Sequence, residues 1–124
     1  MNPTAHTSSG PDGNLWFTES WGNNIARITT EGAITQYSIP TIGSFPLGIA
    51  SGPDGNLWFT EINGRNIARI ATGGAITEYP IPTANSYPWG VASGPDNRVW
   101  FTEEVRNNIG ALRPSAASPR TGPA

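Results

Sequence analysis

The sequence has no cysteine and no lysine, and its only histidine is His6. Without cysteine the chain has no disulfide framework, no thiolate metal site and no cysteine nucleophile. Charged residues make up only 13% of the 124 residues and the formal net charge is -2. So low a positive charge argues against an electrostatic footprint on nucleic acid or on an anionic membrane, and we expect neither as a partner.

Long apolar runs are also missing. No window approaches the roughly 18 apolar residues of a transmembrane helix, and Met1–His6 lacks the basic start and apolar run of a signal peptide. No segment shows an apolar helical period, and 15 glycines with 12 prolines interrupt the chain too often for useful helices. We therefore expect a soluble chain without helices, whose location the sequence does not otherwise indicate.

One ten-residue stretch recurs at a fixed spacing. Gly52–Glu61 reads GPDGNLWFTE, is identical to Gly10–Glu19, and returns altered at Gly94–Glu103, so that the starts at 10, 52 and 94 lie 42 residues apart. A fixed period of this size indicates a repeat architecture, in which stacked units bury their apolar surfaces against one another.

Each period reads as a tight Gly-Pro-Asp-Gly turn and four strands. In the first repeat the expected strands are 14–19, 24–29, 33–39 and 47–51. The core strand carries Leu15 and Phe17 on one face and Trp16 on the other, so its sheet should be covered on both sides. Four strands in about 40 to 45 residues is the size of a β-propeller blade. We predict an all-β fold of β-propeller blades, each with four antiparallel strands.

The predicted organisation has five parts: an N-terminal segment with a weak strand (1–9), repeat 1 (10–51), repeat 2 (52–93), a partial repeat 3 (94–113), and a disordered Pro/Ser/Ala-rich tail (114–124) that cannot form a fourth strand. Three blades do not close a disc and would leave apolar faces in water. We expect homo-oligomerisation to close the ring, preferably as a dimer with six blades, otherwise as a trimer with nine. The junction blade is then incomplete, or it borrows a strand from Met1–Ser9 of a neighbour.

Differences between the repeats concentrate in loops that we call the varied rim: residues 20–23, 41–47, 62–65, 83–89 and 104–107. In a propeller these loops open on one side of the disc. The candidate ligand-binding residues there are Trp21, Arg65, Tyr87, Trp89 and Arg106. Aromatic rings suit a sugar or an apolar ligand, and arginines suit a carboxylate or phosphate. The alternative is that the linker aromatics only cap the packing between blades.

Acidic side chains recur with the same period. Glu19, Glu61 and Glu103 end the core strands and would form a circle of carboxylates in a closed ring. Such oxygen ligands could hold magnesium or calcium. The alternative is pairing with Arg27, Arg69 or loop amides; in the third repeat Ala111 replaces the arginine and leaves Glu103 and its neighbour Glu104 unexplained. The turn aspartates should instead accept hydrogen bonds from local backbone amides: Asp12, Asp54 and Asp96.

Four patterns together resemble a known family: GPDGNLWFTE, Asn-x-Ile-Ala-Arg-Ile, Gly-x-Ile-Thr-x-Tyr-x-Ile-Pro and Pro-x-Gly-Ile-Ala-Ser-Gly-Pro-Asp-Gly. They are similar to the repeats of the virginiamycin B lyase (streptogramin lyase) family, over roughly Gly10–Leu112. The resemblance implies a propeller, with seven blades in the named enzyme, and a magnesium-assisted elimination that opens a lactone. This chain departs from that pattern because it lacks the lyase histidines; His6 lies outside the repeat.

Two functions therefore stay open. The preferred one is a non-catalytic, self-assembling propeller scaffold without a cofactor, which binds a small ligand or a protein on the varied rim. The alternative is a metal-assisted lyase that opens a lactone, in which Glu61, Glu103 or Glu104 holds Mg²⁺ and a ring carboxylate acts as base. Near-identical repeats favour the scaffold, because a single active site needs positions that differ between blades.

Overall fold

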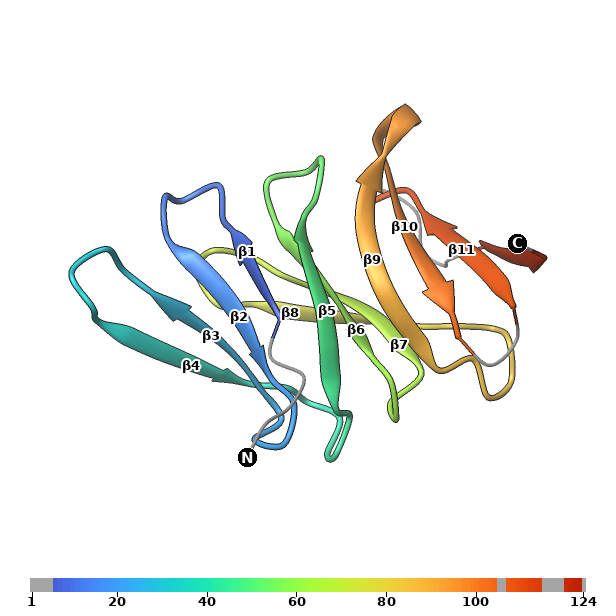
Figure 1. The fold of residues 1–124 in the computed structure, drawn as a ribbon, viewed down its shortest axis with the longest axis horizontal. Helices are drawn as coiled ribbons and strands as arrows, with labels where there is room; N and C mark the ends of the chain where they lie inside the picture. The colour runs from blue at the N-terminus through green and yellow to red at the C-terminus, as the bar shows by residue number, and fades with distance from the viewer. Residues whose placement is uncertain (1–5, 105–106, 115–119, 124) are drawn as a thin grey trace.

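The structure, a computed structural model, describes residues 6–104, 107–114 and 120–123. These residues form three four-stranded antiparallel sheets, here called blades 1, 2 and 3, which Figure 1 shows side by side. Blade 1 holds β1 (Thr7–Ser9), β2 (Leu15–Glu19), β3 (Asn24–Ile28) and β4 (Ile34–Ser38); blade 2 holds β5 (Pro46–Ser51), β6 (Leu57–Glu61), β7 (Asn66–Ile70) and β8 (Ile76–Pro80); blade 3 holds β9 (Pro88–Gly94), β10 (Arg98–Glu103), β11 (Asn108–Leu112) and β12 (Arg120–Pro123). The predicted all-β fold of four-stranded blades is confirmed. A short 3-10 turn, η1 (Pro95–Asn97), precedes β10, and none of the described residues belongs to a helix long and apolar enough to cross a membrane.

The sheets are offset from the sequence repeat by one strand. β5 lies in repeat 1, but it pairs with β6 and opens blade 2, with Ile49 opposite Phe59. In the same way β1 pairs with β2 of its own chain, with Thr7 opposite Phe17. Thr7–Ser9 is therefore part of blade 1, and the alternative in which Met1–Ser9 completes a neighbour's blade is wrong for these three residues.

The prediction that the tail cannot supply a fourth strand is wrong for Arg120–Pro123. These residues form β12, in which Thr121 lies opposite Gly110 and Pro123 opposite Asn108. β12 is the outermost strand of blade 3, and proline is tolerated on an edge strand because its missing N–H removes no interior hydrogen bond. Residues 115–119 and 124, also in the predicted tail, lie outside the described residues. Blade 3 thus has four strands and extends beyond the predicted partial repeat 94–113.

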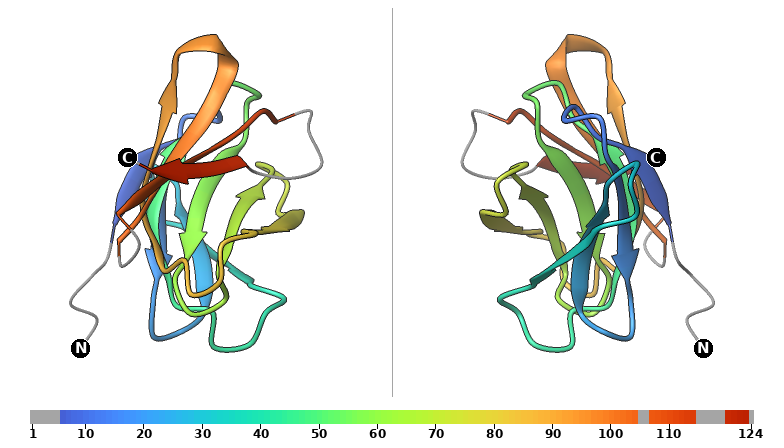
Figure 2. Two further views of the ribbon diagram at one scale, coloured as in Figure 1. Left: turned by 90° about the vertical axis from the view of Figure 1, so that its right-hand side faces the viewer. Right: turned by 90° about the vertical axis from the view of Figure 1, so that its left-hand side faces the viewer.

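The hydrophobic core lies between the blades. Successive side chains of a strand point to opposite faces, so Phe59 of β6 packs toward blade 1 and Trp58 toward blade 3. The first junction buries Trp16, Ile25 and Ile39 of blade 1 against Ile49, Leu57, Phe59, Ala68 and Ile70 of blade 2. The second buries Trp58, Ile67, Tyr79 and Ile81 of blade 2 against Val99, Phe101 and Leu112 of blade 3. Both faces of blade 2 are covered, whereas blades 1 and 3 each turn one face outward, as the end-on views of Figure 2 show.

Candidate functional site

The varied rim lies at one end of the blades, the lower end in Figure 1. Asn23, in the loop after β2, donates from Nδ2 to the Thr41 carbonyl at 2.9 Å and accepts from the Ser44 hydroxyl at 2.6 Å. Thr41 and Ser44 belong to the linker between blades 1 and 2. The loops and the linkers therefore meet at the same end, as the sequence predicts.

Aromatic and basic side chains pair on this rim in two places. The ring centroids of Trp21 and Phe45 lie 5.3 Å apart, edge to face, and Trp21 is 68% exposed. One period later the Arg65 guanidinium carbon lies 5.9 Å from the Tyr87 ring centroid. Phe45 and Tyr87 both have positive φ, 57° and 45°, a conformation that is strained for large side chains and is therefore held by the surrounding linker.

Trp89 and Arg106 complete the predicted ligand-binding set. Trp89 lies in β9 with 42% of its side chain exposed, on a blade that has no following blade against it. Arg106 lies outside the described residues. The rim thus offers one aromatic pair and, separately, one arginine–tyrosine pair, an arrangement suited to a ligand with an apolar ring and an acidic or carbonyl group.

The predicted metal residues are spread over the three blades. Glu61 is fully buried between blades 1 and 2, Glu103 is buried between blades 2 and 3, and Glu104 is exposed. Glu19 faces outward on blade 1. Among the residues that the structure describes, no three His, Cys, Asp or Glu side chains come together as ligands for one ion. A circle of carboxylates therefore requires blades beyond those of one chain and stays a prediction.

The strand-end glutamate of blade 1 has a different polar partner from that of blade 2. Glu19 accepts from Gln36 Nε2 at 2.9 and 3.1 Å. Glu61 accepts from Asn66 Nδ2 at 2.9 Å, but the counterpart of Gln36 in this blade is Glu78, a second carboxyl group. Burial, together with the hydrogen bond and the charge of Glu78, raises the pKa of Glu61 to about 8. At the rim end of blade 2, the raised pKa favours a protonated Glu61 carboxyl group beside Glu78, whereas blade 1 has the Gln36 amide at the equivalent position.

The alternative that Arg27 and Arg69 pair with the strand-end glutamates is wrong. Arg27 lies 3.7 Å from Asp12, and Arg69 lies 3.4 Å from Asp54. The reason is the alternation of the strand: Arg69 stands opposite Trp58 and shares its face, whereas Glu61 points to the other face. The alternation of side chains between the two faces of a strand could have excluded an ion pair between these arginines and the strand-end glutamates.

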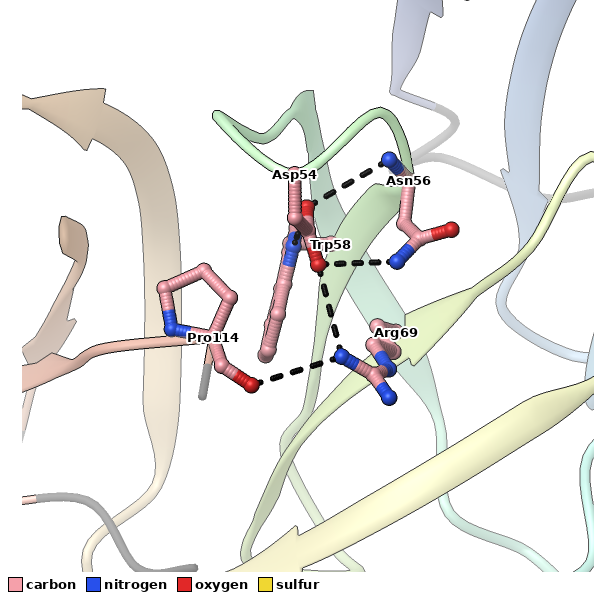
Figure 3. Close-up of polar contacts among 5 residues, drawn as sticks. All are labelled: Asp54, Asn56, Trp58, Arg69 and Pro114. Atoms are coloured by element: carbon pink, nitrogen blue, oxygen red, sulfur yellow. Dashed lines mark hydrogen bonds and ion pairs between the residues drawn. The ribbon is translucent and has the colours of Figure 1, made fainter. Parts of the chain in front are cut away.

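The turn aspartates do more than the predicted backbone bonding. Asp54 Oδ1 accepts from the Trp58 indole at 2.9 Å and from the Asn56 N–H at 3.4 Å, and Oδ2 accepts from Asn56 Nδ2 at 2.8 Å (Figure 3). Although burial works in the other direction, these bonds lower the pKa of Asp54. Asp12 has the same partners in blade 1, Trp16 and Asn14. The carboxylate thus anchors both the turn and the core tryptophan.

A ladder of threonine hydroxyls was missed in the sequence. Thr60 Oγ1 accepts from the Gly48 N–H at 3.0 Å and donates to the Trp89 carbonyl of the next blade at 2.8 Å. Thr18 makes the equivalent donation to the Leu47 carbonyl at 2.9 Å. The signal was present, because threonine recurs in every GPDG-type repeat on the face of the core tryptophan.

Comparison with known proteins assigns the family. The virginiamycin B lyase family model matches residues 2–119. Virginiamycin B lyase from Staphylococcus aureus is 46% identical and superposes with a TM-score of 0.91, covering 95% of this chain and 40% of that one. A catalytically inactive histidine-to-alanine form of the S. aureus enzyme, solved with quinupristin, is likewise 46% identical, with a TM-score of 0.90, covering 94% of this chain and 40% of that one.

More distant structures share only the fold. A gluconolactonase from Xanthomonas campestris is 15% identical, with a TM-score of 0.75, covering 94% of this chain and 46% of that one. No match was found among curated protein sequences. The chain spans about 40% of the length of the lyase structures. On the family match and the 46% identity, this chain belongs to the virginiamycin B lyase family.

Proposed function

We propose that this chain is a non-catalytic three-blade scaffold that copies of itself complete into a ring, with the varied rim as a ligand-binding surface. The observation that carries the proposal is the pair of open blade faces. On blade 1, Leu15 is 42% exposed and Ile34 is 58% exposed. The counterpart of Leu15 in blade 2, Leu57, is fully buried by the preceding blade. The outer face of blade 1 thus has the residues of a blade junction without a blade against it.

The outer face of blade 3 is open in a complementary way. Trp100, Thr102 and Ile109 line a pocket of about 350 Å³ on this face. In blade 2 the counterparts of Trp100 and Ile109, Trp58 and Ile67, are fully buried against blade 3. A blade 1 face would cover this surface as blade 3 covers blade 2, and burial of apolar area at about 25 cal/mol per Å² would favour the contact.

This pairing joins two different faces, so it is a heterologous, head-to-tail contact, which forms a ring when the rotation closes. Two copies would give six blades and three copies nine. Leu15→Arg tests the contact, because it would bury an unpaired charge at the junction. Ile42→Arg is the matched control, since Ile42 is 94% exposed in a linker. Circular dichroism would show whether the Leu15→Arg protein is folded. If the folded variant self-associated as strongly as the native chain, the proposal would be contradicted.

A second candidate function is the lyase activity of the family, which the 46% identity to virginiamycin B lyase favours. The reaction would break the ester C–O bond of a cyclic ester as a base removes a neighbouring C–H proton, giving a carboxylate and an alkene. Because elimination adds no water, the product has the mass of the substrate, whereas hydrolysis adds one water. Quinupristin incubated with the protein and Mg²⁺, followed by chromatography and mass spectrometry, separates these outcomes from no reaction.

The described residues do not fit a complete magnesium site. Mg²⁺ prefers six oxygen ligands, and one or two carboxylates usually hold it with waters and substrate. Glu61 faces the Asn66 amide and the second carboxyl of Glu78, and burial keeps its pKa high, which favours the neutral form. Glu103 lies one junction away. The scaffold is therefore the better supported function, and magnesium chemistry would depend on ligands from other blades.

A further inference from the structure

One arginine links each blade to the next. Arg27 Nη1 donates to the Thr72 carbonyl at 3.1 Å, across the junction from blade 1 to blade 2. The same guanidinium lies 3.7 Å from Asp12 and 5.6 Å from the centroid of the Trp16 ring. We call this unit of turn aspartate, core tryptophan and arginine the clamp. It uses groups of one blade to hold a backbone carbonyl of the next.

The clamp is repeated at the second junction, which Figure 3 shows. Arg69 Nη1 lies 3.4 Å from both Asp54 Oδ2 and the carbonyl oxygen of Pro114 in blade 3. Its guanidinium carbon lies 5.9 Å from the Trp58 ring centroid. Thr72 and Pro114 both lie in the turn between the third and fourth strands and are one period apart. Two junctions in one chain therefore use the same donor and the same acceptor position.

The open face of blade 1 keeps the acceptor half of this arrangement. Thr30 is the residue one period before Thr72, in the turn between β3 and β4. A pocket of about 410 Å³ is lined by Leu15, Ile28 and Thr30, among other residues. In blade 2 the counterparts Leu57, Ile70 and Thr72 receive blade 1 and its arginine. The pocket thus lies where a clamp arginine would reach blade 1.

The open face of blade 3 lacks the donor half. Ala111 replaces the arginine, and the indole nitrogen of Trp100 has no hydrogen-bond partner among the described residues. Asn97 and Arg98 replace the Gly-Asn pair of the turn, and Asp96 has φ 64° within η1. The arginine has moved one strand outward, since Arg120 of β12 stands opposite Ala111.

We infer that the open face of blade 1 is a docking surface for a propeller blade of this repeat type that carries the clamp, whose arginine donates to the Thr30 carbonyl. The internal junctions argue for this occupant, because the same face in blades 2 and 3 receives such a blade. The native blade 3 of a second copy is a poorer occupant, because it has Ala111 in place of the arginine and because no described residue accepts a hydrogen bond from the Trp100 indole. The inference goes beyond the proposed function: it shares the premise that blade 1 receives a further blade, but it does not require that blade to come from a native copy of this chain.

The test rebuilds the clamp in blade 3 of the full chain. Asn97→Gly, Arg98→Asn, Ala111→Arg and Arg120→Thr together restore the residues of blade 2 at Gly55, Asn56, Arg69 and Thr77. We expect at least a tenfold lower dissociation constant for self-association than in the native chain, measured by sedimentation velocity over a concentration series. Adding Leu15→Arg should abolish the gain. The turn-only variant, Asn97→Gly with Arg98→Asn, is the matched control and should show no gain.

The outcomes separate the inference from the proposed function. A clamp variant that associates while the native chain stays monomeric supports the inference and overturns ring closure by native copies. Equal association of the two proteins overturns the inference and leaves closure by copies standing. A clamp variant that melts as cooperatively as the native chain but associates no more tightly also overturns the inference.

Discussion

The hydroxyl of Thr60 donates a 2.8 Å hydrogen bond to the carbonyl of Trp89, and so joins the second strand of one blade to the first strand of the next. The same oxygen accepts the Gly48 N–H at 3.0 Å, and Thr60 is fully buried. Space here is limited as well: a Cβ on Gly48 would lie 2.6 Å from the Trp89 carbonyl oxygen. The junction between blades is therefore polar at its inner strands, apolar across the middle of the sheet, and polar again where the clamp arginine meets the next blade.

Replacing Thr60 with valine should destabilise the protein by about 2 to 3 kcal/mol, because two buried backbone groups lose their partner. Chemical denaturation measures this. Thr102→Val, measured in protein dilute enough to be monomeric, is the matched control: Thr102 accepts from the Gly90 N–H at 3.0 Å but in a single chain is exposed and has no following blade. Its loss should be well below that of Thr60→Val. Equal losses would mean that the bond between blades contributes nothing.

Glu78→Gln should stabilise the protein above neutral pH, because the new side-chain amide could donate to Glu61 as Gln36 donates to Glu19. The pKa of Glu61 in the fold is about 8, against an ordinary 4.5, so the folded state holds a proton that the unfolded state has released. Stability should therefore decline as pH rises from about 4.5 toward 8, and level off above. The variant should flatten this decline in denaturation measured from pH 5 to pH 9. Glu31→Gln, at an exposed turn, is the control.

Asp54→Asn should cost about 1 to 2 kcal/mol at pH 7, because it weakens the bond from the Trp58 indole and removes a charge beside Arg69. The pKa of Asp54 is lowered in the fold, so its carboxylate stabilises the protein above the ordinary value of 3.8 and loses that effect as pH falls through the folded pKa. The difference between wild type and variant should shrink on acidification. Asp96→Asn is the control and should have little effect, because the Trp100 indole has no partner among the described residues. If it lost as much stability as Asp54→Asn, the hydrogen bond between Asp54 and Trp58 would not explain the effect.

Tyr87→Ala and Trp89→Ala should each weaken quinupristin binding about tenfold, the equivalent of roughly 1.4 kcal/mol from one lost aromatic contact. Isothermal titration calorimetry without added magnesium separates binding from turnover. Ile42→Ala is the control, because Ile42 is 94% exposed and carries no ring. If both aromatic variants bound quinupristin as tightly as the native chain, Tyr87 and Trp89 would not be part of the binding surface.

Much of the fold could be predicted because the period of 42 residues and the alternation of Leu15, Trp16 and Phe17 reflect two-sided packing directly. The tail could not be, because β12 falls out of the period: Pro123 stands where Pro80 stands in blade 2, one residue later than the repeat. Composition alone suggested disorder, yet the edge of a sheet accepts proline, and a neighbouring strand supplies the hydrogen bonds.

The candidate site was predictable only in part. Recurrence and variation identified Arg65 and Tyr87, which the structure brings together. The proton held by Glu61 was not foreseen, because it depends on a partner 17 positions away that is glutamine in blade 1 and glutamate in blade 2. Charge pairing across strands follows register and face, and a carboxylate close in sequence, such as Glu61 for Arg69, can lie on the wrong face.

The solution mass of the native chain tests the central claim most directly. Multi-angle light scattering after size exclusion, with the monomer at 13.1 kDa, should give two or three times that mass at high concentration, for six or nine blades. The mass should fall toward the monomer in the Leu15→Arg protein and not in Ile42→Arg. A native chain that stays a folded monomer at every concentration would contradict closure of the ring by copies of this chain.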